Sequence, residues 1–174
     1  MDYGRSLEKF MMMEDATWKR HANPWSVWTR FMILPLFVLA IWSRAWIGWW
    51  CCVPIGLLLV WTFLNPRVFS KPLSTDNWAS KATFGERVWL RRKSTPIPTH
   101  HVQIAHALSA ATALAVIPLV YGIIIYEPLV TCLSLVLVIG GKLWFLDRMV
   151  WLYHDVKDRN KEYASWLYCD VSDC

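Results

Sequence analysis

Residues 45–64 read AWIGWWCCVPIGLLLVWTFL and contain no charged side chain. A helix needs about 20 apolar residues to cross the roughly 30 Å of hydrocarbon in a bilayer. The length and composition of this stretch therefore predict a membrane-spanning helix. Over the whole chain of 174 residues, 56% are hydrophobic and only 18% are charged. That composition excludes a disordered chain, which would be rich in charge and poor in aromatic residues.

Two later stretches predict spans of the same kind. Residues 102–126 carry no charge when His106 is neutral. Residues 128–152 contain Lys142 within the apolar run and reach Asp147 only near the end of that run. Both stretches are long enough to cross the hydrocarbon layer.

The first predicted span, residues 24–43, has a shorter charge-free part than the other three. Its uncharged core, residues 31–42, would be only about 18 Å long as a helix. Asn23 followed by Pro24 is typical of a helix start, with an N-cap and a proline at the first helical position. A helix that begins there crosses the bilayer if Arg30 extends its guanidinium back to the surface. A tilted or re-entrant segment is the alternative.

The gaps between the spans are unequal and predict two hairpins. Only Ser43 and Arg44 separate the first pair, and only Glu127 and Pro128 separate the second, whereas the stretch 65–101 joins the pairs. We expect a single all-α membrane domain of four transmembrane helices, arranged as two helical hairpins with interfacial amphipathic helices. An N-terminal arm (1–22) and a C-terminal tail (153–174) complete it.

The basic residues predict the orientation of the spans. The formal net charge is +5, and lysine and arginine concentrate in the arm, the middle loop and the tail. The hairpin tips carry Arg44 alone. By the positive-inside rule, both termini and the middle loop face the cytoplasm or its equivalent. Because the topology accounts for the positive charge, we expect the lipid bilayer and no nucleic acid as a partner.

Two stretches have the pattern of amphipathic surface helices. Residues 5–20 place apolar side chains on one side and charges on the other. In residues 75–93, Trp78 and Trp89 recur at helical spacing, whereas Arg87 and Arg91 point away from them. Ser74 or Thr75 is the expected N-cap of this helix. This helix either offers an interface for anionic lipid or a partner, or covers the inner mouth of the bundle. The covering role is favoured.

The ionisable residues of the predicted spans gather near the inner side. Arg30, Lys142 and Asp147 fall within about 10 Å of that surface. The full polar layer comprises His21, Arg30, His100, His101, His106, Lys142, Asp147, His154 and Asp155. Ionisable groups at membrane depth are functional candidates, because burying charge in hydrocarbon is costly unless the charge is paired.

Three chemistries fit this layer. Asp147, His154 and Asp155 can share a helix face and, with His100, His101 or His106, supply nitrogen and oxygen ligands to a metal. His106 alone can ligate a haem or a pigment. The favoured interpretation is structural: Asp147 pairs with Arg30 or Lys142, and the histidines are hydrogen-bonded in the interface. Cys169 and Cys174 lack partners for a zinc site, and an inner location disfavours a disulfide if that compartment is reducing.

Several motifs resemble those of a known group of proteins. The run HANPWSVWTR (21–30) is followed by NPR (65–67), NWASK (77–81), FGERVWL (84–90) and KLWFLDRMVW (142–151). Together they resemble a family of small multi-pass membrane proteins known as a domain of unknown function. The resemblance covers residues 21–155, and the flanking arm and tail look peculiar to this chain. It implies a membrane protein and transfers no catalytic residue.

Motifs for phosphate loops, dinucleotide binding, nucleophile elbows or zinc proteases are absent from the sequence. We therefore assign no catalytic residue and expect an accessory or structural subunit of a larger energy-transducing membrane complex, respiratory or photosynthetic. Its expected partners are lipid and other membrane-protein subunits. The alternative is a membrane-bound redox enzyme that uses the inner histidines with a metal or haem.

Overall fold

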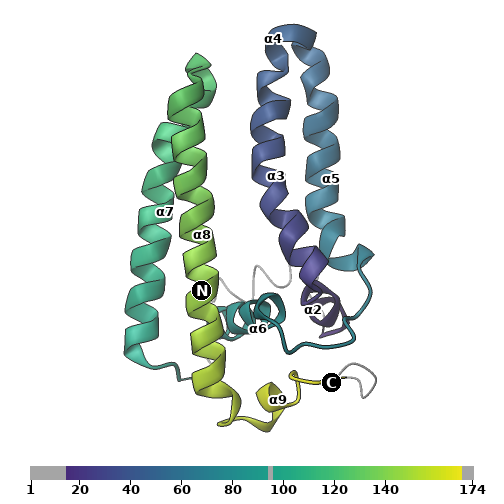
Figure 1. Cartoon of the computed structure of the whole chain (residues 1–174), viewed down its shortest axis with the longest axis vertical. Coiled ribbons are helices and arrows are strands. Elements are labelled where there is room, and N and C mark those ends of the chain that lie inside the picture. Colours follow the sequence, from purple (N-terminus) through teal and green to yellow (C-terminus); the bar gives the residue numbers. More distant parts are fainter. Residues whose placement is uncertain (1–14, 94–95, 170–174) are drawn as a thin grey trace.

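The computed structural model describes residues 15–93 and 96–169, and in this part every regular element is helical (Figure 1). The helices are α2 (Asp15–His21), α3 (Pro24–Trp42), α4 (Arg44–Ile47), α5 (Cys52–Val68), α6 (Trp78–Leu90), α7 (Thr99–Ile125), α8 (Pro128–Lys157) and α9 (Lys161–Ala164), with a 3₁₀ turn η1 (Gly48–Cys51). Of the predicted surface helix 5–20, residues 5–14 lie outside the described part, and the rest belongs to α2.

Helix α3 begins where the sequence predicts. The side chain of Asn23 accepts a hydrogen bond from the backbone N–H of Trp25 at 2.9 Å, and Pro24 occupies the first turn, where its missing N–H leaves no donor unused. Helix α3 then runs for 19 residues, about 28 Å.

The reversal between α3 and α5 is longer than the predicted two residues. Residues 43–51 form the short helix α4 and the turn η1, and Gly48 adopts a φ of 55°, which favours glycine. The expected span 45–64 is therefore shifted: α5 starts at Cys52 and continues to Val68. Figure 1 shows α3 and α5 side by side, with α4 at the tip.

The second pair, α7 and α8, packs along its whole length and reverses at Tyr126 and Glu127. The close approach depends on small residues. A Cβ at Gly122 would lie 2.6 Å from the hydroxyl of Thr131. A Cβ at Gly141 would overlap the hydroxyl of Thr112. Small residues at such crossings are typical of helix packing in membranes.

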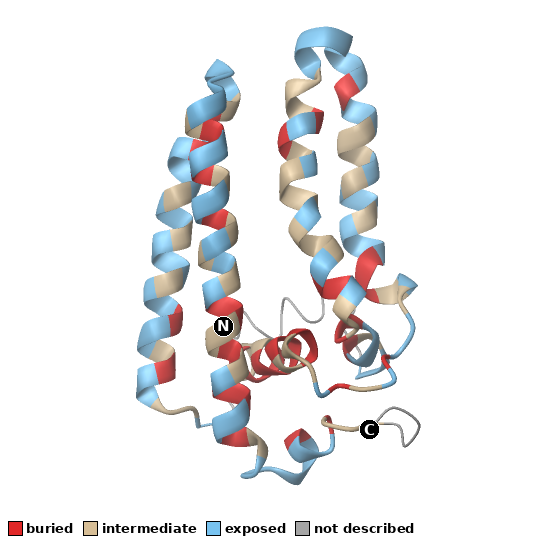
Figure 2. Cartoon of the chain, in the orientation of Figure 1, coloured by how far each residue is buried: buried red, intermediate tan, exposed pale blue. Residues whose placement is uncertain are grey.

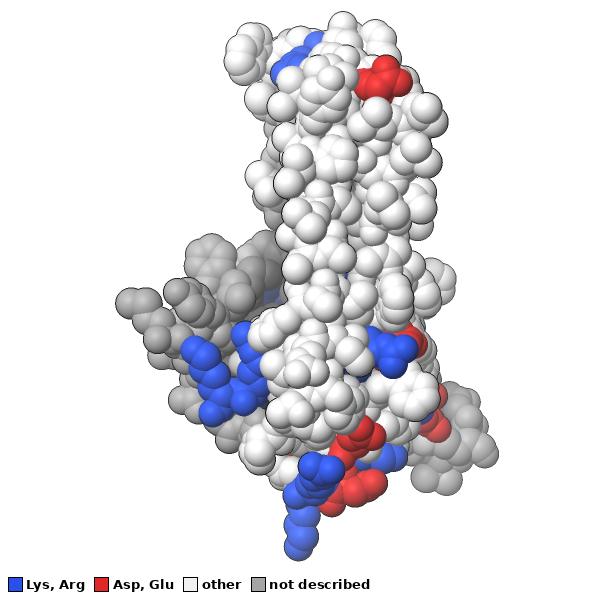
Figure 3. Space-filling model, turned by 90° about the vertical axis from the view of Figure 1, so that its left-hand side faces the viewer, with Lys and Arg blue, Asp and Glu red and all other residues white. Residues whose placement is uncertain are grey.

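Three segments of the described chain are long and apolar enough to cross a membrane: Pro24–Val68, Thr99–Ile125 and Pro128–Lys157. The first has 45 residues and contains both α3 and α5. On the face drawn in Figure 3, charged residues gather at one end and at the opposite tip, and the long stretch between them is uncharged. These features indicate an integral membrane protein.

The best-buried part of the protein lies at the charged end, around α6. Figure 2 shows buried residues concentrated in α6 and the lower part of α8, whereas the upper parts of the long helices are largely exposed. Helix α6 crosses α8 at Gly85, where a Cβ would overlap the backbone carbonyl of Met149. Tyr153 and Leu152 of α8 are fully buried in the same core.

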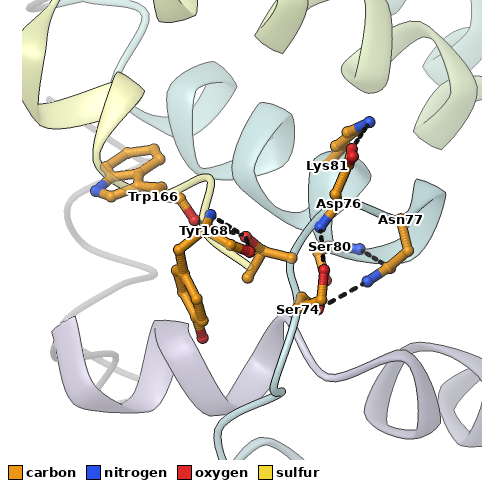
Figure 4. A network of polar contacts seen from close by, with 8 residues as sticks. Ser74, Asp76, Asn77, Ser80, Lys81, Trp166 and Tyr168 are labelled. Carbon is orange, nitrogen blue, oxygen red and sulfur yellow. Dashed lines mark hydrogen bonds and ion pairs between the residues drawn. The ribbon is translucent and has the colours of Figure 1, made fainter. Parts of the chain in front are cut away.

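The C-terminal segment is fastened to the start of α6 (Figure 4). The backbone N–H of Thr75 donates to the carbonyl of Tyr168 at 2.9 Å, and the backbone N–H of Tyr168 donates to the hydroxyl of Thr75 at 2.8 Å. That hydroxyl donates to the carbonyl of Trp166 at 3.0 Å. Thr75 is therefore not the cap of α6. Asn77 is the cap, accepting from the N–H of Ser80 at 2.9 Å.

Cys169 is disulfide-bonded, contrary to the expectation from an inner tail. Cys174, which was considered together with Cys169 in the sequence, lies outside the described residues.

Candidate functional site

The polar layer is built where α2, α3, α6 and α8 meet. Arg30 of α3 donates from Nε to the carbonyl of Ser26 at 3.1 Å and from Nη1 to Nε2 of His21. Since a guanidinium only donates, His21 accepts through Nε2 and is a neutral imidazole with its proton on Nδ1. That Nδ1 is buried and has no hydrogen-bond partner among the described residues.

Burial and the neighbouring charge of Arg30 keep His21 neutral. Its side chain is 8% exposed, and these two effects lower the pKa of His21 from 6.5 to about 3. Desolvation disfavours the charged imidazolium, and the guanidinium adds repulsion. His21 therefore contributes an acceptor to this site and no charge.

Glu86 of α6 supplies the negative charge of the site. Its Oε1 lies 2.7 Å from Nζ of Lys142 on α8. Burial alone would raise the pKa of Glu86, but the charges of Lys142 and Arg30 lower it to about 2. The carboxylate is therefore ionised at neutral pH.

Glu86 lies outside the polar layer predicted from the sequence. The favoured structural interpretation paired Asp147 with Arg30 or Lys142, but in the structure Asp147 accepts a hydrogen bond from Nε1 of Trp78 at 3.3 Å. Five residues turn an α-helix by about 140° beyond a full turn, so Lys142 and Asp147 point to different sides of α8. Lys142 and Met149, seven residues apart, share a face. Gly85 contacts Met149, and Glu86 is the next residue on α6. Glu86 therefore lies against the face of α8 that also presents Lys142.

These side chains line a small cavity, which we call the inner cleft. Its volume is about 100 Å³, and it is bounded by Val27, Arg30, Phe31, Glu86, Lys142 and Leu146. Two cations and one carboxylate give it a net charge of +1. Lys142 is 45% exposed and Glu86 21%, so the charged rim is open to one side.

The remaining predicted histidines do not join the inner cleft. His101 is buried and lies 2.7 Å from Oδ2 of Asp155, with His100 at 3.9 Å from the same oxygen. The ring of His106 contacts that of Trp89 edge-on at 5.3 Å. His154 is exposed beside Tyr153. The sequence pattern grouped His154 with Asp155, but neighbouring residues of a helix point about 100° apart.

The four residues predicted as an interface have different surroundings. Arg87 and Trp89 are buried inside the protein, where the guanidinium of Arg87 contacts Asp15 and lies 4.5 Å from the ring of Trp166. Trp78 stacks on Trp28 of α3 at 5.8 Å. Arg91 pairs with Glu162 of α9 at 3.3 Å. Arg87 and Trp89 thus belong to the core at the charged end of the protein, and Trp78 and Arg91 contact α3 and α9.

Acid is expected to destabilise the protein through His21. Below pH 6.5 the unfolded chain binds a proton at this residue, whereas the folded chain does not until the pH approaches about 3. Stability should therefore fall as the pH decreases from 6.5 toward 3. His21→Gln, which keeps an acceptor for Arg30, should reduce that slope.

Thermal unfolding in mild detergent between pH 7 and pH 5 measures the effect. Equal slopes for the wild type and the variant would contradict the assigned neutral state of His21.

The fold and the site together define a helical integral membrane protein with a charged cleft at one end of its apolar helices. The chain belongs to a family of unknown function, DUF6653, whose model matches residues 4–167. The match extends beyond residues 21–155, so the arm and tail are shared with the family over most of their length, contrary to the expectation from the motifs. Comparisons with curated proteins and with solved structures give no match.

Proposed function

We propose that this protein is a non-catalytic, multi-pass membrane protein that binds the anionic headgroup of a membrane lipid in the inner cleft. The observation that carries the proposal is the net positive charge of that cleft, at the end of apolar helices. A single unbalanced cation in a low-dielectric site attracts one anionic group strongly.

The proposal places α3, α5, α7 and α8 across the bilayer as four spans. Support comes from the lengths of α3 and α5, 19 and 17 residues, each of which approaches the hydrocarbon thickness. The distribution of basic residues supports an orientation with α2, α6 and α9 on the cytoplasmic or equivalent inner side. The inner cleft then lies just below the headgroups of the inner leaflet.

The size and walls of the inner cleft favour a lipid over a larger soluble ligand. A cavity of about 100 Å³ accommodates a phosphate or carboxylate group and little more. Val27, Phe31 and Leu146 form its apolar wall, next to which an acyl chain can lie. Arg30 is suited to the headgroup because its planar guanidinium can donate two parallel hydrogen bonds to a phosphate.

Lipid analysis of the protein purified from native membranes at low detergent tests the proposal. Native mass spectrometry should find one anionic phospholipid per chain, retained by the wild type and lost from Lys142→Gln and Arg30→Gln. Arg148→Gln is the matched control, because Arg148 follows on the same helix and does not line the inner cleft. Equal lipid retention in Lys142→Gln and the wild type would contradict the proposal, as would displacement of the lipid by inorganic phosphate alone.

A second proposal concerns assembly: the protein acts as an accessory subunit of a larger membrane complex, with energy-transducing complexes as the expected setting. Support comes from α5, which packs mainly against α3 and α2 and leaves Leu57, Leu59 and Val60 exposed. Trp49 at the hairpin tip is 91% exposed. Mild-detergent purification should recover partner subunits in constant proportion. A stable monomer with no co-purifying membrane protein would contradict this proposal.

A further inference from the structure

A second group of polar side chains lies apart from the inner cleft, where α7 begins and α8 ends. His100 and His101 occupy the first turn of α7, and Asp155 lies near the end of α8. Each offers one ligand atom, and these three atoms lie within 4.8 Å of one another. Within the described residues, this is the group of histidine, cysteine and acidic side chains whose geometry can hold a metal ion.

The distances match the requirements of a small divalent ion. Zinc binds nitrogen and oxygen at about 2.0–2.2 Å, so tetrahedral ligand atoms lie roughly 3.4 Å apart. Oδ2 of Asp155 lies 2.7 Å from Nε2 of His101 and 3.9 Å from Nε2 of His100, values on either side of that spacing. The two imidazole rings lie 4.1 Å apart and direct Nε2 toward the same carboxylate oxygen.

Burial distinguishes this group from an ordinary surface ion pair. The side chain of His101 is only 6% exposed, so its orientation is fixed by the surrounding helices. His100 and Asp155 are 61% and 46% exposed, which leaves the ligand atoms accessible to an ion from water. An ion can therefore reach His100 and Asp155 from water and bind the fixed His101 without any unfolding of the surrounding helices.

We propose that His100, His101 and Asp155 bind a divalent transition-metal ion of the zinc type. Two imidazole nitrogens and one carboxylate oxygen form a ligand set that suits such an ion, and water takes the fourth position. The ion joins the start of α7 to the end of α8, which are 54 residues apart in sequence. This inference is independent of the proposed lipid site.

Zinc binding by the full-length protein in detergent tests the proposal. After treatment with EDTA and removal of the chelator, titration with ZnCl₂ against a chromogenic chelator should show one site per chain. Thermal stability should rise with added Zn²⁺, because a ligand that binds the folded state shifts unfolding by mass action. His100→Ala and Asp155→Asn should each weaken binding by at least about tenfold, since even outer-shell partners contribute that much.

His154→Ala provides the matched control. It removes an exposed histidine from the residue next to Asp155, and it should leave affinity unchanged. His100 is exposed, so its replacement leaves the fold intact and a loss of binding reports on the site itself. Absence of stoichiometric zinc binding in the wild type would overturn the proposal. Equal affinity in His100→Ala and the wild type would overturn it as well.

Discussion

Gly85→Val is expected to prevent the base of the bundle from assembling. At this residue α6 crosses α8 so closely that a Cβ would overlap the backbone carbonyl of Met149, and Met149 is fully buried. Backbone cannot move aside as a flexible side chain can, so the helices must separate. Separation would open the core that α6 shares with Tyr153 and Leu152. The expected loss is about 3 kcal/mol or more, a large fraction of ordinary domain stability.

The measurement is the amount of protein that remains monodisperse after extraction, together with its unfolding temperature. Gly140→Ala is the control, because Gly140 is also helical and a Cβ there meets open space in the described part of the chain. Alanine favours helix over glycine by roughly 1 kcal/mol, so this variant should be neutral or slightly more stable. Wild-type stability in Gly85→Val would mean that α6 does not cross α8 at this point.

Glu86→Gln should have the next largest effect, because it leaves the charges of Arg30 and Lys142 without a balancing carboxylate in a low-dielectric setting. Removing one member of a fully buried ion pair costs about 3 kcal/mol or more, and because the side chain of Lys142 is 45% exposed, solvent screening reduces the expected cost here to about 1–2 kcal/mol. The folded-state pKa of Glu86, about 2, lies below its ordinary value of 4.5. Its contribution should therefore persist above pH 4.5 and decline as the pH falls from there toward 2.

Two comparisons separate this effect from a general loss of charge. Glu162→Gln breaks an exposed pair with Arg91 and should cost at most about 1 kcal/mol. The double variant Glu86→Leu with Lys142→Met removes both charges and should recover much of the stability, because apolar replacement of a buried pair is often tolerated. Equal destabilisation by Glu86→Gln and Glu162→Gln in unfolding experiments would rule out a buried role for Glu86.

The sequence was informative about the long helices because their determinants are local. Uninterrupted apolar runs and the Asn23-Pro24 start predicted α3, and charge-free composition predicted α7. The shape of the first hairpin tip was less predictable. The run Gly48-Trp49-Trp50 is apolar, and an apolar run can either continue a helix or form a turn. Hydropathy therefore could not predict the positive φ of Gly48, at which the chain turns.

The candidate sites were only partly predictable, because each depends on a tertiary crossing. Arg30 and Lys142 were recognised as ionisable groups at one depth, with His21 just outside on the same side. Glu86 joins them only because Gly85 brings α6 against α8. The caps show the same limit. Thr75 has the composition of a cap, but its partner Tyr168 lies 93 residues away, so Asn77 serves instead.

The most direct test of the account is the sidedness of the two ends of the bundle. In a background with all native cysteines replaced by serine, Arg44→Cys reports on the hairpin tip and Arg91→Cys on the end that contains α6 and the inner cleft. Sealed vesicles of known orientation are treated with a membrane-impermeant maleimide, before and after permeabilisation. The two positions should react from opposite sides, with Arg91→Cys on the cytoplasmic or equivalent inner side. Reaction of both from the same side would contradict the crossing helices and the lipid-binding cleft proposed beneath them.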